Sequence, residues 1–315
     1  LALAACSGGT NADDKNTDSS EDTYTIGVLY LDQEVLLSEA TAGCQAYAAE
    51  HSNVKLIEYN ANKDVSTQLK QCENLISQNV DAIALTPVDG AGCDQIINAC
   101  KDAGIPLICF HAKVKGAPIT NILFDNVGFG KMQVDYAMEI FEKSGGDMNG
   151  TINVGIVTGK LDNQNAVERC QGYEEQLKNY ANATIVDEQV GSWNRDDAMA
   201  IAENWITSGR DIDIILSNND AMAIGISLAY ANANVERPII IGVGGTEEGL
   251  TAILNGDFDG TVFQPAYQNG YDAIDFTVKY LNGETLEESY VTEGVLVTPE
   301  TAQATLDDLK AMLNS

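Results

Sequence analysis

Short apolar runs of strand length alternate along this chain with longer segments in which apolar residues recur every three to four positions. In the first part of the chain, the strand-like runs occupy residues 24–31, 54–59, 82–85, 106–110 and 119–124. The helix-like segments lie between them, at residues 34–51, 65–78 and 91–103. This alternation predicts βαβ units, a parallel sheet and right-handed crossovers.

The same alternation starts again near Gly128 and predicts a second unit of similar size. Its helices are expected at residues 129–143, 166–179, 195–207, 221–231 and 247–255, and its strands at 152–157, 184–190, 212–216, 238–243 and 260–263. A helix at 267–281, a strand at 294–297 and a helix at 302–313 follow, and they allow the chain to cross back between the two units. The predicted fold class is therefore α/β, with two doubly wound parallel-sheet lobes and a ligand cleft between them.

The segment from Asp213 to Gly225 has the most informative pattern, because it predicts a strand, a polar turn and a helix in succession. The apolar residues 214–216 are typical of a strand buried on both faces. Residues 217–220 are polar and include side chains that cap helices. Polar side chains are thus expected at the carboxyl end of a parallel strand, where open α/β sheets bind ligands.

Other polar and aromatic residues occupy equivalent positions, at a strand's carboxyl end or in the turn after it. The candidate ligand-binding residues are Glu34, His111, Asn163, Asn165, Arg169, Trp193, Asn219 and Gln264. Amides, carboxylates and a guanidinium can satisfy sugar hydroxyls, which both donate and accept hydrogen bonds. An aromatic ring can cover the C–H face of a sugar. Any one of these residues alone is more often a turn residue, but eight at the same edge of two sheets predict a binding site.

Composition and motifs argue against several other functions. The formal net charge is −30, so nucleic acid is not expected as a partner. With two histidines and no Cys/His cluster, no metal site is predicted, and residues 147–150 begin like a calcium loop without its later ligands. No complete phosphate-binding or dinucleotide-binding glycine motif occurs, so no cofactor is predicted. Nothing assembles a nucleophile with a base, so the sequence favours a protein that is not an enzyme.

The first residues suggest where the protein resides. Leu3-Ala4-Ala5-Cys6 is typical of a bacterial lipobox, so residues 1–6 are interpreted as a signal-peptide remnant and Cys6 as the lipidation site. Residues 7–23 are poor in apolar side chains and predict a flexible tether. We therefore expect a lipid-anchored protein at the extracellular face of the cell membrane or in the periplasm.

Six further cysteines follow no C-x-x-C pattern: Cys44, Cys72, Cys93, Cys100, Cys109 and Cys170. Buried free thiols are the favoured interpretation. A disulfide between Cys72 and either Cys93 or Cys100 remains the alternative, if their helices are neighbours.

Several segments resemble the type I periplasmic binding proteins, specifically the glucose/galactose- and ribose-binding solute-binding proteins of ABC importers. These segments are Thr25-Ile26-Gly27-Val28, residues 81–87, residues 166–172, residues 218–225 and residues 260–264. The resemblance covers nearly all of residues 24–313. It implies two lobes joined by a three-strand hinge, an N-terminal lobe of residues 24–125 plus 265–291, and a C-terminal lobe of residues 126–264 plus 292–315. It also implies a monomer that carries a small carbohydrate-like ligand to a membrane permease, or, as an alternative, a sensor that docks onto a membrane receptor.

The same resemblance assigns roles to individual residues. Counterparts of Arg169, Asn219 and Gln264 bind sugar oxygens in the family, and the counterpart of Trp193 stacks on the sugar. Gly244 stands where the family usually has an aspartate that accepts from two sugar hydroxyls, which favours a modified sugar, a polyol or another small hydroxylated ligand over plain glucose or galactose. The site also departs from the glucose/galactose branch at Glu34, at Leu36, which stands where that branch has a stacking aromatic residue, and at His111, Asn163 and Asn165.

Overall fold

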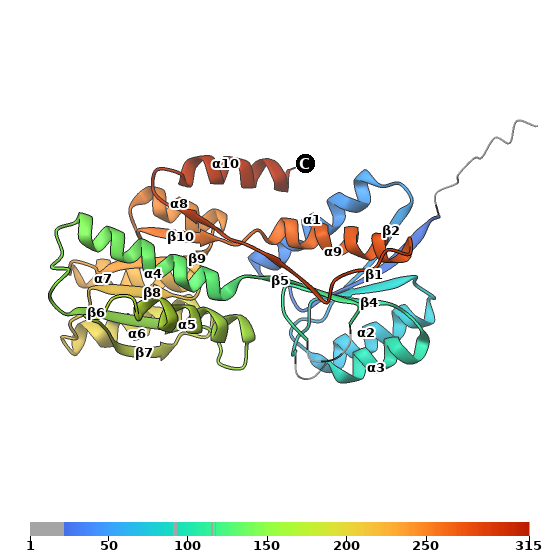
Figure 1. The fold of residues 1–315 in the computed structure, drawn as a ribbon, viewed down its shortest axis with the longest axis horizontal. Helices are drawn as coiled ribbons and strands as arrows, with labels where there is room; N and C mark the ends of the chain where they lie inside the picture. Colours follow the sequence, from blue (N-terminus) through green and yellow to red (C-terminus); the bar gives the residue numbers. More distant parts are fainter. Residues whose placement is uncertain (1–21, 91–92, 115, 117, 315) are drawn as a thin grey trace, which may run out of the picture.

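Two six-stranded sheets form the centres of two lobes that lie end to end in the computed structural model (Figure 1). The structure describes residues 22–314, except 91, 92, 115 and 117, so the lipobox at Cys6 and nearly all of the expected tether lie outside the described residues. Within that part, none of the helices is long and apolar enough to cross a bilayer.

The sheet of the first lobe is parallel throughout. Its strand order is β11 (Ser289–Thr292), β5 (Thr120–Phe124), β4 (Leu107–Phe110), β3 (Ala82–Leu85), β1 (Tyr24–Tyr30) and β2 (Val54–Asn60). Its helices are α1 (Val35–Glu50), α2 (Val65–Ser77), α3 (Asp94–Ala103) and α9 (Ala266–Leu281). α1 and α9 pack together and share one core with β1 and β4, and α2 and α3 share another with β3. Each face of the sheet is thus covered by a pair of helices.

The sheet of the second lobe repeats this plan with one antiparallel edge. Its order is β12 (Val295–Val297), β10 (Gly260–Phe263), β9 (Ile239–Gly244), β8 (Ile214–Ser217), β6 (Ile152–Thr158) and β7 (Ala183–Val190). Its helices are α4 (Asn126–Lys143), α5 (Gln164–Leu177), α6 (Arg195–Thr207), α7 (Asp220–Ala233), α8 (Glu247–Asn255) and α10 (Ala302–Leu313). β12 runs antiparallel to β10, and the other pairs are parallel.

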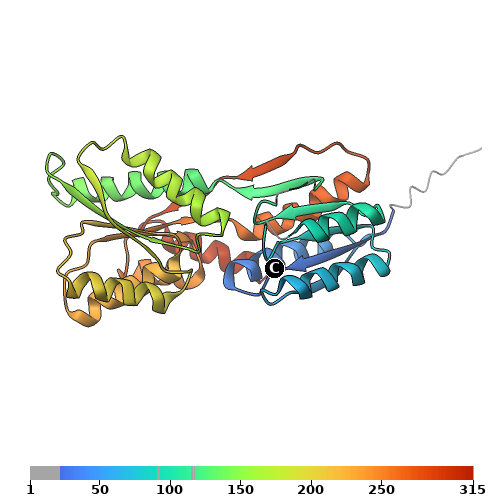
Figure 2. The same cartoon turned by 90° about the horizontal axis from the view of Figure 1, so that it is seen from below.

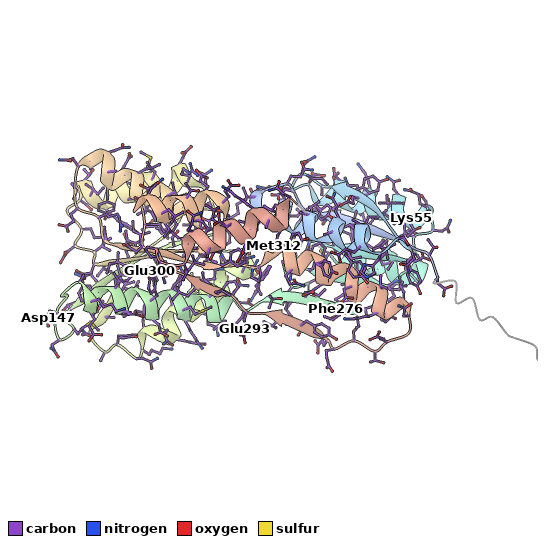
Figure 3. All side chains as sticks on the ribbon, turned by 90° about the horizontal axis from the view of Figure 1, so that it is seen from above. Lys55, Asp147, Phe276, Glu293, Glu300 and Met312 are labelled. Carbon is purple, nitrogen blue, oxygen red and sulfur yellow. The ribbon has the colours of Figure 1, made fainter. Side chains whose placement is uncertain are left out.

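The chain passes between the lobes at three places (Figures 1 and 2). It leaves β5 for α4 at Asp125, leaves β10 for α9 at Gln264 and Pro265, and leaves β11 for β12 near Glu293. Figure 3 places Glu293 at the junction, between Lys55 in the first lobe and Asp147 at the far end of the second. The predicted two-lobe α/β fold with a three-strand hinge is therefore confirmed.

Three differences from the sequence prediction have a clear physical reason. β11 was not predicted, because this short edge strand alternates exposed and half-buried residues and has no apolar run. α4 begins at Asn126, three residues earlier than expected, because Asp125 caps it by accepting from the Gly128 N–H at 2.8 Å. β12 was expected in a wholly parallel sheet, but it returns along β10 after a short connection from β11.

Pairs of glycines let helices approach closely in both lobes. A methyl group on Gly43 of α1 would lie 1.9 Å from the Tyr267 carbonyl oxygen of α9, and one on Gly270 of α9 would lie 1.9 Å from the Ala40 oxygen of α1. In the second lobe, a methyl on Gly130 of α4 would lie 2.2 Å from the Arg169 carbonyl oxygen of α5. These contacts leave no room for a side chain, so they fix α9 against α1 and α5 against α4.

The six cysteines of the described residues are all free. Cys72 on α2 and Cys100 on α3 are buried, with their sulfur atoms 3.6 Å apart. The two helices are thus neighbours, as the disulfide alternative required, and the structure shows both groups as thiols.

Candidate functional site

Arg169 is the centre of the candidate site. Its side chain extends from α5 and is only 3% exposed. Nε donates to Asn126 Oδ1 at 3.0 Å, Nη1 donates to the Asn218 carbonyl at 2.5 Å, and Nη2 donates to Gln264 Oε1 at 2.6 Å. Burial lowers the pKa of Arg169 to about 10, so the guanidinium remains charged at neutral pH. One cation thereby joins the start of α4, the end of β8 and the end of β10.

Trp193 and Asn219 form one wall beside this guanidinium. The Arg169 guanidinium carbon lies 5.6 Å from the centre of the Trp193 ring. Ser192 and Trp193 have φ angles of 54° and 66°, a left-handed turn that follows β7. Asn219 Nδ2 donates to the Trp193 carbonyl at 3.3 Å, and its Oδ1 caps α7 by accepting from the Met222 N–H at 2.9 Å. The cap and the turn together hold the indole in position.

Asn165 and His111 connect the two lobes. Asn165 Nδ2 donates to the His111 carbonyl at 3.4 Å, and Asn165 Oδ1 accepts from Asn126 Nδ2 at 3.2 Å. His111 follows β4 with a φ angle of 69°, and its ring is edge-on to Phe124 at 5.4 Å. The His111 Nδ1 atom is buried and has no hydrogen-bond partner within the described part of the chain. Burial lowers the pKa of His111 to about 4, so the imidazole is neutral at pH 7.

A pH dependence of stability follows from the buried His111 ring. Because its pKa falls from about 6.5 in the unfolded chain to about 4 in the folded one, protonation favours unfolding. Stability should therefore fall as the pH drops from 6.5 to 4, by at most about 3 kcal/mol, and should not depend on this group above pH 6.5. Urea denaturation of the wild type and of His111→Asn at several pH values measures the difference. Asparagine tolerates the left-handed backbone at this position.

The other histidine provides the control for that experiment. Between pH 6.5 and 4, His51→Gln should lose as much stability as the wild type does. His111→Asn should lose less stability over the same range. Equal pH profiles for the wild type and His111→Asn would contradict the burial of a neutral ring.

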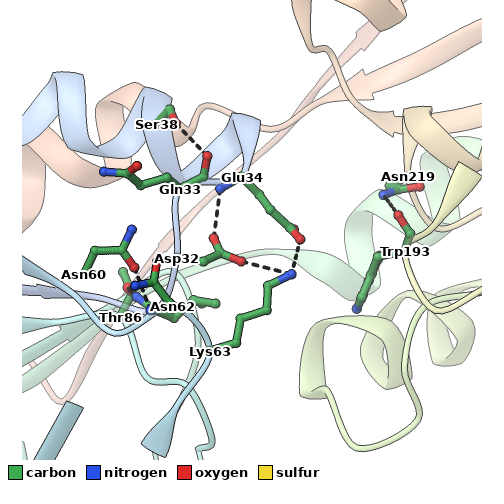
Figure 4. A network of polar contacts seen from close by, with 11 residues as sticks. Asp32, Gln33, Glu34, Ser38, Asn60, Asn62, Lys63, Thr86, Trp193 and Asn219 are labelled. Atoms are coloured by element: carbon green, nitrogen blue, oxygen red, sulfur yellow. Dashed lines mark hydrogen bonds and ion pairs between the residues drawn. The ribbon is translucent and has the colours of Figure 1, made fainter. Parts of the chain in front are cut away.

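Glu34 lies on the first lobe and stands apart from the Arg169 network. It pairs with Lys63, whose Nζ also lies 3.2 Å from Asp32 Oδ2. Figure 4 shows this pair directed toward the side of the second lobe that carries Trp193 and Asn219. The Glu34 side chain is 62% exposed, and the carboxylates raise the pKa of Lys63. Glu34 is thus placed on the opposite side of the interlobe region, with its charge already paired.

A periplasmic binding protein domain matches residues 28–285 of this chain. The chain belongs to the periplasmic binding protein family. The Mycolicibacterium smegmatis xylitol-binding protein is 30% identical over 309 residues, which cover 98% of this chain and 83% of that protein. The Escherichia coli galactofuranose-binding protein is 26% identical over 300 residues, covering 91% of this chain and 92% of that protein.

A solved structure agrees with this assignment. An ABC transporter solute binding protein from Bacillus halodurans with bound myo-inositol superposes with a TM-score of 0.82. It is 29% identical, and the match covers 92% of this chain and 99% of that one. The predicted resemblance to type I periplasmic binding proteins is confirmed, and the relatives named here are binding proteins for sugars or polyols.

In this periplasmic binding protein, six of the eight predicted residues share one network of contacts: His111, Asn165, Arg169, Trp193, Asn219 and Gln264. Sequence analysis missed Asn126 and Asn218, which hold Arg169, and the Asp32–Lys63 ion pair. Asn126, Asn218 and Asp32 all follow strands closely, so the rule that found the others could have found them. Within the described residues, no group of three or more His, Cys, Asp or Glu side chains is arranged to hold a metal ion.

Asn163 has a local structural role. It is the N-cap of α5, and its Oδ1 accepts from the Asn165 N–H at 2.9 Å. Asn163→Ala should therefore lower the free energy of unfolding by about 1 kcal/mol, and Asn163→Ser, which preserves a cap, by much less. Urea denaturation measures both variants. If Asn163→Ala and Asn163→Ser lower the free energy of unfolding by the same amount, capping is not the role of this side chain.

Proposed function

We propose that this periplasmic binding protein binds one small polyhydroxylated molecule, a polyol or a modified sugar, between its lobes and delivers it to an ABC permease. The observation that carries the proposal is the buried, charged Arg169, held by Asn126, Asn218 and Gln264 and lying over Trp193. A fixed guanidinium with amides around it supplies donors and acceptors to hydroxyls, and the indole offers a face to C–H groups.

The candidate site residues come from both lobes, which supports a ligand bound between them. Glu34 and His111 come from the first lobe, whereas Asn163, Asn165, Arg169, Trp193 and Asn219 come from the second, and Gln264 lies at a crossing between them. A ligand in this position would hold the lobes together, which is how hinged proteins of two domains close on small molecules. The relatives that bind xylitol, galactofuranose and myo-inositol favour a polyol or a non-pyranose sugar.

We also propose where the protein resides and how it acts. A lipid on Cys6 would anchor the protein at the extracellular face of the membrane, and residues 7–23 would let the monomeric binding domain reach its permease. The protein releases the ligand unchanged, since its role is capture and transfer rather than catalysis.

A ligand screen tests the proposal. Purified protein is mixed with xylitol, myo-inositol, ribose, galactose and arabinose, and thermal unfolding is followed, with isothermal titration calorimetry for each hit. A ligand present at about 1,000 times its Kd adds about 4 kcal/mol of stability, which raises Tm by several degrees. We expect one or more polyols or sugars to bind at 1:1 stoichiometry and to be recovered unchanged. Absence of binding across the panel, or conversion of the bound molecule, would contradict the proposal.

A further inference from the structure

Glu39 is a buried carboxylate on α1 that the function described so far does not use. Its side chain is 3% exposed, and within the described residues its Oε2 atom has no hydrogen-bond partner. A carboxyl group in this state is unfavourable, because burial removes water without supplying a donor in its place. An unused acceptor of this kind marks a position where a donor from outside the protein can bind.

The surroundings of Glu39 place it at the hinge. The next residue, Ala40, contacts Gly270 of α9, and α9 begins directly after Gln264 and Pro265 at the crossing between the lobes. The first residues of α9 are Ala266, Tyr267 and Gln268, so this neighbouring turn contributes no charge to Glu39. The site residue Gln264 and the free carboxyl group therefore lie near the same end of α9.

Asp220, at the start of α7 in the second lobe, lies near enough to Glu39 for its charge to act on the Glu39 carboxyl group. Burial and the nearby charge of Asp220 raise the pKa of Glu39 to about 8. Asp220 is itself satisfied, since its carboxylate accepts from the N–H groups of Gly245 and Thr246 and from the Thr261 hydroxyl, at 2.7, 3.1 and 2.6 Å. Glu39, in contrast, is free to accept.

Gly244 brings no side chain to this point of the second lobe. Gly244, at the end of β9, has a φ angle of 141°, and a Cβ atom on it would lie 3.0 Å from Asp220 Oδ2. The Gly244 carbonyl is also occupied, because it accepts from the Gln264 N–H at 2.9 Å. A carboxylate acceptor at this side of the site can therefore come from Glu39 of the opposite lobe.

We propose that Glu39 is a specificity-determining residue that accepts hydrogen bonds from two adjacent hydroxyl groups of the ligand, opposite Gly244. This inference rests on the proposed function and specifies the part of the ligand that Glu39 recognises, a pair of adjacent hydroxyl groups such as polyols, cyclitols and sugars carry. The two oxygens of one carboxylate match two neighbouring donors, and the bond relieves the unpartnered state of the carboxyl group.

Calorimetry of Glu39→Gln with xylitol and myo-inositol tests this role. We expect the variant to bind the tighter of the two ligands about 10- to 100-fold more weakly than the wild type, since hydrogen bonds to a charged group are lost. The ligand-free variant should unfold at the same temperature or a higher one, because a buried unpartnered acid is replaced by a neutral amide. A purely structural role would predict the opposite change in stability. Glu50→Gln, at the exposed end of the same helix, is the matched control and should bind like the wild type.

Proton release provides a second readout. A carboxyl group with a pKa near 8 is mostly protonated at pH 7, and it ionises when ligand hydroxyls donate to it. Titrations of the wild type at pH 7, in two buffers of different ionisation enthalpy, should therefore show proton release, and Glu39→Gln should show much less.

The outcomes separate this inference from the proposed function. If Glu39→Gln binds with the same affinity and the same proton release as the wild type, Glu39 has no role in binding. The proposed function would still stand. If the wild type binds neither polyol but binds a sugar of the screen, the same comparison is made with that sugar; failure to bind any ligand of the screen would count against both. Weaker binding by Glu39→Gln together with loss of proton release would support the inference.

Discussion

Replacement of Arg169 with alanine is expected to weaken ligand binding by at least about 100-fold, which corresponds to about 3 kcal/mol. The guanidinium is the buried charge of the site, and it fixes Asn126, Gln264 and the Trp193 ring at the same time. Its removal takes away a charged donor and also releases the side chains that it orients. Calorimetry with the best ligand of the screen measures the loss.

Two further variants make this prediction specific. Arg169→Lys keeps the charge but lacks the planar set of donors that reaches three acceptors in different directions, so it should also bind weakly. Arg210→Ala, which removes a partly exposed arginine paired with Asp187 in the same lobe, should bind like the wild type. Circular dichroism shows whether each variant is folded. A folded Arg169→Ala protein with wild-type affinity would show that the site has been assigned wrongly.

Replacement of Gly270 with alanine should destabilise the protein by about 3 kcal/mol. The new methyl group would lie 1.9 Å from the Ala40 carbonyl oxygen, and this atom belongs to the backbone of α1 and cannot move aside like a side chain. The helices must separate, which opens the core beneath α1 and α9. Thermal and urea denaturation should show a Tm lower by several degrees.

The control for this substitution lies on the same helix. Gln268→Ala changes an exposed residue that bonds only to Asp272, so it should alter stability by less than about 0.5 kcal/mol. If Gly270→Ala were as stable as Gln268→Ala, the close approach of the two helices would not hold in solution.

The Gly270 contact also bears on ligand binding. Only Pro265 separates α9 from Gln264, whose side chain accepts from Arg169, so the position of this helix sets the position of a site residue. A rearranged α1–α9 interface would therefore displace Gln264, and Gly270→Ala should weaken ligand binding as well as stability.

The sequence predicted the fold because its strands are central and buried. Residues 214–216 are apolar and lie between two other strands, so the pattern alone identified β8 and the turn that carries Asn219. The pattern did not predict β11, because an edge strand needs no apolar run. The start of α7 was predicted to within one residue because its polar capping segment was recognised. The starts of α4 and α5 were predicted three and two residues late, because the caps Asp125 and Asn163 were not recognised.

The site was only partly predictable, for a different reason. Residues that follow a strand directly, such as Asn219 and Gln264, can be chosen by their position in the chain. Arg169, in contrast, lies inside α5 and not in the turn after β6. The partners of Arg169 depend on how three separate strand ends meet, and the pairing of Lys63 with Asp32 joins two loops. Glu39 lies inside a helix and is buried where α1 packs against α9, a contact between distant segments that no local pattern records.

The measurement that most directly tests binding between the lobes is a fluorescence titration with the best ligand of the screen. The chain has two tryptophans, of which Trp193 lies beside Arg169, whereas Trp205 is buried in the core of the second lobe. Wild-type fluorescence should change on ligand addition and saturate at the calorimetric Kd, and the change should vanish in Trp193→Phe. A full fluorescence change that persists in Trp193→Phe, with unaltered affinity, would place the ligand elsewhere and contradict the account.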